Sequence, residues 1–162
     1  MKVRDIMTES PASCSMNTNL CAATELLWKR NCGILPVVND EQRVVGVVTD
    51  RDICIALGTR NRLPSETIVG EVASGNVFAC RPDDDVHTAL TTMAQGKVRR
   101  LPVINAEGKL EGLLSMDDII QQSASGKEAR PDSITHHEVV AALRNIYQPA
   151  MAEHAARKIA AA

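Results

Sequence analysis

The chain has 162 residues, which is enough for one domain of ordinary size or for two small halves that share one core. Hydrophobic residues make up 44% of the sequence and aromatic residues only 2%, so the core must be built from aliphatic side chains. The formal net charge of −2 argues against a nucleic-acid-binding protein with a broad basic surface. No leader segment and no run of roughly 20 apolar residues is visible, so we expect a cytoplasmic protein that does not enter the membrane.

The first 60 residues predict a β-α-β-β-α unit. Apolar side chains at Leu20, Ala23 and Leu27 recur at helical spacing behind the helix-opening residues 17–19. Two short apolar runs separated by a polar turn then predict a buried hairpin. In chain order, the expected elements are an extended piece around 12–15, a helix that stops near Gly33, strands at 35–38 and 44–48, and a short helix from about 50 to 57.

The same unit recurs 66 positions later, with 46 matching 112 and 52 matching 118, without a gap. Its clearest part is a stretch that opens at a glycine, runs through apolar residues to a hydroxyl residue and ends in an acid three positions on. This stretch reads GVVTDRD at 46–52 and GLLSMDD at 112–118. Internal repetition in a fixed register indicates a duplicated structural unit, so we predict one repeat at 1–60 and a second at 61–123.

The sequence changes character after the second repeat. Residues 124–132 are polar and predict a flexible hinge, and Thr135 and Glu138 then have the spacing of a helix-capping box. The apolar stripe of the expected helix is Val139, Val140, Leu143, Ile146 and Tyr147. Pro149 is expected to start a further Ala-rich helix. We therefore predict that 124–162 form a hinge and C-terminal helices, which bury their stripe on the body, on a second copy or on a partner.

The sequence carries no pattern typical of a catalytic or metal site. His137 and Glu138 would begin an H-E-x-x-H zinc motif, but Ala141 stands where the second histidine belongs. G-x-S-x-G, P-loop and G-x-G-x-x-G patterns are also absent. The five cysteines contain no C-x-x-C pair, which favours reduced thiols acting as small hydrophobic residues over a redox or metal site. We therefore expect a protein that is not an enzyme and needs no catalytic cofactor.

The duplicated unit resembles the CBS domain pair, also called a Bateman module. The resemblance is carried by both Gly-to-Asp stretches and by the Leu-Pro strands that precede them at 35–38 and 101–104, and it covers roughly residues 1–123. It implies an α/β (α+β) fold of tandem β-α-β-β-α repeats with pseudo-two-fold symmetry, followed by the C-terminal helical tail. It also implies a regulatory sensor that binds an adenosyl nucleotide (AMP, ADP, ATP or NAD(H)), forms a homodimer and signals to a protein effector through the C-terminal helices.

The same resemblance implies which residues bind the nucleotide. Asp52 and Asp118 occupy the position of an acid that accepts hydrogen bonds from the ribose hydroxyls, and a charged acceptor strengthens such bonds. Thr49 and Ser115 stand at strand-to-helix junctions, where two interpretations stay open: donation to a ribose or phosphate oxygen, or plain helix capping. The adenine is expected in an aliphatic slot. The full predicted set is Thr8, Ala12, Thr49, Asp50, Arg51, Asp52, Val77, Arg99, Arg100, Pro102, Ser115, Met116 and Asp118.

Positive charge is unequal between the two predicted clefts. Because clefts in the family draw on both repeats, the cleft with Asp118 is expected to hold Arg99 and Arg51. The cleft with Asp52 is expected to hold Arg99 and Arg100, together with the carboxylate of Asp117 from the second repeat. On charge alone, the Asp118 cleft is predicted to be the better phosphate site, and the other to take a less anionic ligand or to bind weakly.

Two other functions stay open at this stage. In the first, the clefts are empty and the protein is a dimerisation or interaction module that acts through its C-terminal helices. In the second, which ranks lowest, it is an enzyme.

Overall fold

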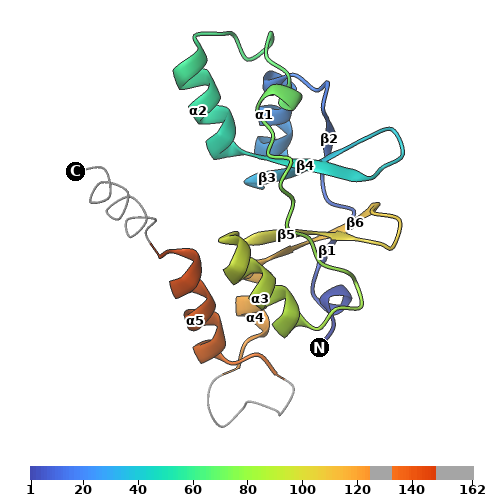
Figure 1. Cartoon of the computed structure of the whole chain (residues 1–162), viewed down its shortest axis with the longest axis vertical. Coiled ribbons are helices and arrows are strands. Elements are labelled where there is room, and N and C mark those ends of the chain that lie inside the picture. The colour runs from blue at the N-terminus through green and yellow to red at the C-terminus, as the bar shows by residue number, and fades with distance from the viewer. Residues whose placement is uncertain (125–132, 149–162) are drawn as a thin grey trace, which may run out of the picture.

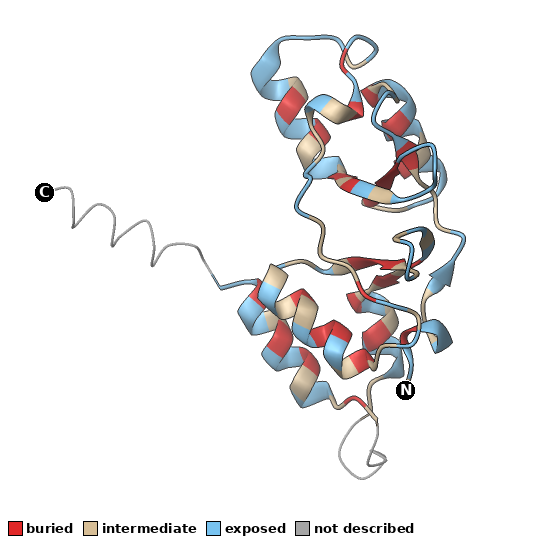
Figure 2. Cartoon of the chain, turned by 45° about the vertical axis from the view of Figure 1, so that its right-hand side comes forward, coloured by how far each residue is buried: buried red, intermediate tan, exposed pale blue. Residues whose placement is uncertain are grey.

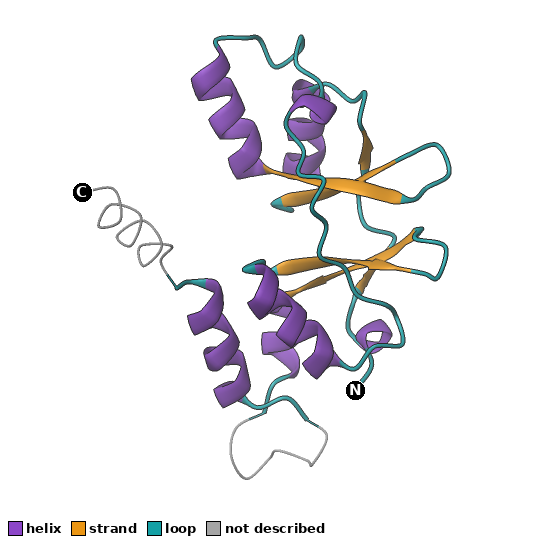
Figure 3. Cartoon of the chain, in the orientation of Figure 1, coloured by secondary structure: helices purple, strands orange, loops and turns teal. Residues whose placement is uncertain are grey.

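The computed structural model describes residues 1–124 and 133–148. Two three-stranded sheets lie in the middle of the molecule, with the longer helices on their outer sides (Figures 1 and 3). We call the part built on β2-β3-β4 the first half and the part built on β1-β6-β5 the second half. The elements in chain order are η1 (Val3–Asp5), β1 (Thr8–Glu9), β2 (Cys14–Ser15), α1 (Leu20–Lys29), β3 (Ile34–Val38), β4 (Val44–Thr49), α2 (Asp50–Arg60), η2 (Val69–Glu71), α3 (Val86–Gly96), β5 (Arg100–Ile104), β6 (Leu110–Ser115), α4 (Met116–Gln122) and α5 (His136–Ile146).

Both predicted hairpins are confirmed. β3 pairs antiparallel with β4, and β5 pairs antiparallel with β6, each with a register shift after the equivalent residues Val37 and Val103. Every residue of β3 is buried. A strand that is apolar along its whole length, rather than in alternation, is typical of a sheet covered on both faces. The mixed α and β architecture of tandem repeats is therefore the one that the sequence predicts.

Each half also contains an extended segment from the other repeat. β1 pairs antiparallel with β6, so that Thr8 lies opposite Leu113. At the equivalent position of the second repeat, Ser74 forms an antiparallel bridge with Val47 in the first half. The start of each repeat therefore crosses to the sheet of the other, and the spatial halves do not coincide with the two stretches of sequence.

The same exchange reaches the two aliphatic cores (Figure 2). Val3, at the start of the first repeat, is fully buried in the core of the second half. Its counterpart Val69 is fully buried in the core of the first half. Burial of a valine side chain stabilises a protein by about 1.5–3 kcal/mol. The start of each repeat thus stabilises the opposite half.

The two hairpin turns meet where the halves are related by pseudo-two-fold symmetry. Val44 N donates to the carbonyl of Gly108 at 3.0 Å, and Leu110 N donates to the carbonyl of Gln42 at 3.1 Å. Since 44 and 110, like 42 and 108, are equivalent positions in the two repeats, each bond is the image of the other. The predicted pseudo-two-fold symmetry is therefore present at the level of single hydrogen bonds.

The tail helix α5 packs against α3 of the second half (Figure 1). The predicted capping box is confirmed, because the Thr135 side chain accepts from Glu138 N and the Glu138 carboxylate accepts from Thr135 N. The buried residues of the helix are Val139, Ala142 and Ile146. The predicted stripe was wrong at Val140 and Tyr147, which are 48% and 61% exposed, and it missed the buried Ala142. On a helix with 3.6 residues per turn, Val139, Ala142 and Ile146 lie on one face, and Val140 lies away from its centre.

The end of α2 and the extent of the tail differ from the prediction or lie outside what the structure describes. Helix α2 runs to Arg60 rather than to about residue 57, and it ends where Asn61 takes a left-handed conformation with φ of 49°. Asparagine tolerates this conformation better than most residues, which makes it a common helix terminator. The predicted hinge and the second tail helix fall mainly on 125–132 and 149–162, which lie outside the described residues.

Candidate ligand-binding cleft

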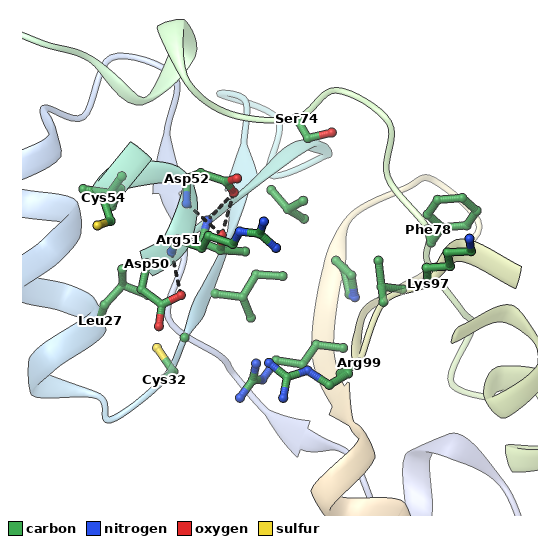
Figure 4. A pocket seen from close by; sticks show the side chains of 18 of the residues that line it. Leu27, Cys32, Asp50, Arg51, Asp52, Cys54, Ser74, Phe78, Lys97 and Arg99 are labelled. Atoms are coloured by element: carbon green, nitrogen blue, oxygen red, sulfur yellow. Dashed lines mark hydrogen bonds between the residues drawn. The ribbon is translucent and has the colours of Figure 1, made fainter. Parts of the chain in front are cut away.

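A cleft of about 1300 Å³ lies between the two halves where β4 meets α2 (Figure 4). Its walls come from the end of α1, the β4–α2 junction, the segment around 74–78, the connection from α3 to β5 and the end of α5. Both halves therefore contribute side chains to it. Because Asp52 lies in its wall, we call it the Asp52 cleft.

The β4–α2 junction presents a carboxylate with one unused oxygen. Asp52 Oδ2 accepts from Thr49 N at 2.9 Å and from Thr49 Oγ1 at 2.6 Å, while Asp52 N donates back to Thr49 Oγ1 at 3.2 Å. These bonds form a capping box at the start of α2 and fix the carboxylate in place. Its other oxygen, Oδ1, has no hydrogen-bond partner among the residues that the structure describes. A fixed carboxylate oxygen is a strong acceptor for a hydroxyl group of a ligand.

The second half repeats this junction at the start of α4. Asp118 Oδ2 accepts from Ser115 N at 2.8 Å and from Ser115 Oγ at 2.6 Å. Helix capping by Thr49 and Ser115 is thereby confirmed. Contact of either hydroxyl with a nucleotide stays a prediction.

Gly33 allows charged groups from both halves to approach the same point. A Cβ atom at this position would lie 3.2 Å from Asp50 Oδ2 and 3.5 Å from Arg100 Nη1. Asp50 belongs to α2 of the first half and Arg100 to β5 of the second. A side chain at residue 33 would make Asp50 move slightly and would contact Arg100, so the glycine leaves room for both groups on this side of the cleft.

Four cationic side chains line the cleft and only two carboxylates oppose them. The cations are Arg51, Lys97, Arg99 and Arg100, and the carboxylates are Asp50 and Asp52. None of the four cations forms an ion pair with a described residue, whereas arginines such as Arg4, Arg43 and Arg62 on the outer surface are paired with acids. Cations that converge on a cleft without acidic partners attract an anionic ligand.

All three aromatic residues of the chain line this same cleft: Trp28, Phe78 and Tyr147. The Phe78 ring lies on the end of α3, where a Cβ atom at Gly96 would come within 2.7 Å of the ring. At the equivalent positions of the first repeat stand Ala12 and Arg30. The ring and the glycine that makes room for it are therefore a feature of the second repeat alone.

The structure divides the predicted site residues into two groups. Those that line the Asp52 cleft are Thr49, Asp50, Arg51, Asp52, Arg99, Arg100 and Pro102. Those that do not line it are Thr8, Ala12, Val77, Ser115, Met116 and Asp118. The division follows from the exchanged segments: because β1 pairs with β6, Thr8 lies near the Asp118 junction, and the segment around 74–78 takes the equivalent place in the Asp52 cleft.

The structure shows more positive charge in the Asp52 cleft than the sequence predicted. Arg51, which was predicted for the Asp118 cleft, lines the Asp52 cleft together with Arg99 and Arg100. Arg51 follows Asp50 at the start of α2, beside the Asp52 capping box, so the helix that carries Asp52 also brings the arginine. The charge argument therefore now favours the Asp52 cleft.

Comparison with known proteins agrees with this architecture. A family model of the CBS domain matches residues 3–59 and again 69–125. The chain belongs to the CBS domain family. The CBS domain-containing protein YhcV of Bacillus subtilis is 34% identical over 128 residues, which cover 78% of this chain and 89% of YhcV. Other relatives are longer: this CBS pair spans 58% of an uncharacterised protein of Methanopyrus kandleri at 31% identity, and 41% of one from Methanocaldococcus jannaschii at 29% identity.

Solved CBS pairs share the fold, and two of them are complexes with adenosyl ligands. The CBS domain pair of protein MJ0100, in complex with 5-methylthioadenosine and S-adenosyl-L-methionine, superposes with a TM-score of 0.69 at 25% identity, covering 75% of this chain and 94% of that one. CBSX2 of Arabidopsis thaliana, in complex with AMP, superposes with a TM-score of 0.65 at 29% identity, covering 74% and 93%. Two proteins with this fold are thus known in complex with an adenosyl ligand.

Two features are missing from the part of the chain that the structure describes. Within 1–124 and 133–148, no three His, Cys, Asp or Glu side chains are grouped so that they could hold a metal ion. No helix in these same ranges is long and apolar enough to span a membrane.

Proposed function

We propose that the Asp52 cleft binds an adenosine nucleotide and that this CBS pair acts as a nucleotide sensor. One observation carries the proposal: a carboxylate with an unused oxygen in the first half faces the same cleft as four cations without ion pairs to described residues, three of which come from the second half. A nucleotide needs both kinds of group, because its ribose presents hydroxyl donors and its phosphates present negative charge. The adenosyl ligands of the related structures support the same class of ligand.

Each part of a nucleotide has a matching group in the cleft. Asp52 Oδ1 accepts from a ribose hydroxyl, and Arg99 and Arg100 donate to phosphate oxygens through the planar fork that arginine offers. Arg51 adds charge from the first half. The apolar side chains available to the base are Ile34, Val47, Val98 and Pro102.

A ligand held in this way joins the two halves. Asp52 belongs to the first half. Arg100 begins β5 of the second half, and Arg99 directly precedes it. A ligand that contacts both shifts the population toward the arrangement in which both contacts are made. The expected signal is therefore a change in how the halves pack, produced by binding without catalysis.

Calorimetry with a panel of AMP, ADP, ATP, NAD, S-adenosylmethionine and adenosine tests the proposal. We expect at least one phosphorylated member to bind with a micromolar dissociation constant, which corresponds to about −8 kcal/mol. Adenosine is the matched control, since it lacks only the phosphates, and it should bind more weakly. Absence of heat for every member at millimolar ligand, confirmed by an unchanged melting temperature, would refute the sensor function.

Alkylation of the cysteines provides an independent test of where the ligand binds. Cys32 and Cys54 line it, whereas Cys21 is exposed on α1 away from it. Burial raises the pKa of the Cys14 thiol to about 11 and that of Cys80 to about 12, so these two should resist alkylation in the folded protein. AMP should slow alkylation of Cys32 and Cys54 by N-ethylmaleimide and leave Cys21 unchanged, as mass spectrometry of timed samples will show. Equal protection of Cys21 would place the ligand elsewhere.

The competing hypothesis of an empty interaction module places the contact on the C-terminal helices. Within the described part of the tail, α5 buries Val139, Ala142 and Ile146 in its own chain, so this stripe is not open to a partner. A homodimer, a protein effector and a cytoplasmic location stay predictions, and the effector would then have to recognise a surface other than this buried stripe.

A further inference from the structure

The C-terminal end of α5 lies in the wall of the Asp52 cleft. Ile146 and Tyr147 both line it, although they follow the second repeat by more than 20 residues of sequence. Ile146 belongs to the core of the second half, which places the end of the helix beside the cleft. The end of α5 therefore contributes side chains to the cleft.

Tyr147 makes its one side-chain hydrogen bond in the described structure to a cleft arginine. The Arg99 Nη1 group donates to Tyr147 Oη at 3.1 Å, and Arg99 Cζ lies 5.9 Å from the centre of the tyrosine ring. Tyr147 is 61% exposed, so packing alone does not hold its ring in this position. A guanidinium group has five N–H donors, and the bond to Tyr147 uses one of them. The others stay available for a phosphate.

The opposite end of α5 is fixed by different contacts. Thr135 and Glu138 close the capping box, and Glu138 Oε1 lies 3.5 Å from His87 Nε2 on α3. The hydrogen bonds from Thr135 hold the pKa of Glu138 below its ordinary value, so the carboxylate is charged at neutral pH. The start of α5 is therefore held by contacts away from the cleft, whereas its last turn is linked to Arg99 through Tyr147.

We propose that Tyr147 positions Arg99 for the anionic part of the ligand, so that occupation of the Asp52 cleft and docking of the last turn of α5 stabilise each other. This inference rests on the proposed nucleotide site. An arginine that is already held in the cleft loses less conformational freedom when it binds a phosphate, which raises affinity. By linkage, a phosphate that fixes Arg99 stabilises the bond from Arg99 to Tyr147 by the same factor. The first repeat has Gly33 at the position equivalent to Arg99, so the arginine–tyrosine contact has no counterpart in that repeat.

Calorimetry on Tyr147→Phe compares AMP with adenosine. The substitution keeps the ring and removes the oxygen that accepts from Arg99, so AMP should bind about fivefold more weakly while adenosine affinity stays the same. The control variant is Val140→Ala, on the exposed face of the same helix, which should change neither affinity. An equal loss for AMP and adenosine would show that Tyr147 has only a structural role and would overturn the inference.

Hydrogen exchange provides the reciprocal measurement on the full chain. AMP should increase the protection of the amides at 144–147 in the wild type, and this gain should be absent in Tyr147→Phe and in Arg99→Gln. If the wild type binds AMP and Tyr147→Phe binds it equally well with the same gain in protection, the inference fails while the nucleotide site stands. If the wild type binds no member of the panel, the proposed function fails, and the inference fails with it.

Discussion

Replacement of Asp52 by Asn should weaken AMP binding about tenfold to hundredfold, because a hydrogen bond to a charged group contributes about 1.5–3 kcal/mol. The unused Oδ1 of Asp52 is the acceptor that we assign to the ribose, and an amide in its place carries no charge. Asparagine keeps a side-chain oxygen that can accept from Thr49, so the capping box that Asp52 closes at the start of α2 is preserved in part. Isothermal titration of AMP into the purified variant measures the loss.

The chain contains a matched control for this experiment. Asp118→Asn removes the same charge from the same kind of capping box, closed with Ser115 at the start of α4. We expect this variant to melt at nearly the temperature of Asp52→Asn and to bind AMP within about twofold of the wild type, as for a substitution remote from the site. Equal losses in the two variants would refute the preference for the Asp52 cleft, and a larger loss in Asp118→Asn would restore the ranking that the sequence alone suggested.

Truncation of one valine in each repeat should loosen the half on the opposite side. Val3→Ala removes two methyl groups from the core of the second half, and Val69→Ala removes them from the core of the first. Each substitution should lower the free energy of unfolding by about 2 kcal/mol, from lost burial and the cavity left behind. Urea denaturation followed by circular dichroism measures this loss.

Hydrogen exchange on the same two variants tests where each loss falls. Val3→Ala should increase exchange in β5 and β6, and Val69→Ala should increase it in β3 and β4. The two variants are controls for each other, because they make the same chemical change at equivalent positions. If Val3→Ala loosened β3 and β4 instead, each repeat would be the stabilising unit for its own sheet, and the exchanged arrangement would be wrong.

The elements within each repeat were predictable because their signals are local. Thr49 followed by an acid at position 52 is a capping box that can be read without a structure, and Ser115 repeats it. The pairing of β1 with β6 had no such signal, since β1 is two residues long and its partner lies more than 100 residues away. A strand this short owes its existence to its partner rather than to its own residues. The exchange, and with it the placement of Thr8 and Ala12, therefore became visible only in three dimensions.

The candidate site was predictable in its chemistry but not in its location. The resemblance supplied the acids, hydroxyl residues and arginines, and seven of the predicted residues do line one cleft. It could not say which cleft gathers them, because that depends on where long arginine side chains point. The aromatic lining was also missed, although the difference between Ala12 and Phe78 at equivalent positions was available in the sequence as a sign that the clefts had diverged.

The bonds between the two hairpin turns and the crossed starts of the repeats bear on the origin of the molecule. One repeat by itself has a β4 edge that needs Ser74, and a core that needs Val69, from the other repeat. A half-length ancestor could meet these needs only by trading its first residues with a second, identical chain. The arrangement of the present chain is that of such a pair joined end to end. Because the repeats are separate stretches of one sequence, equivalent positions can differ, as Ala12 and Phe78 do, and Tyr147 beyond the second repeat lines one cleft.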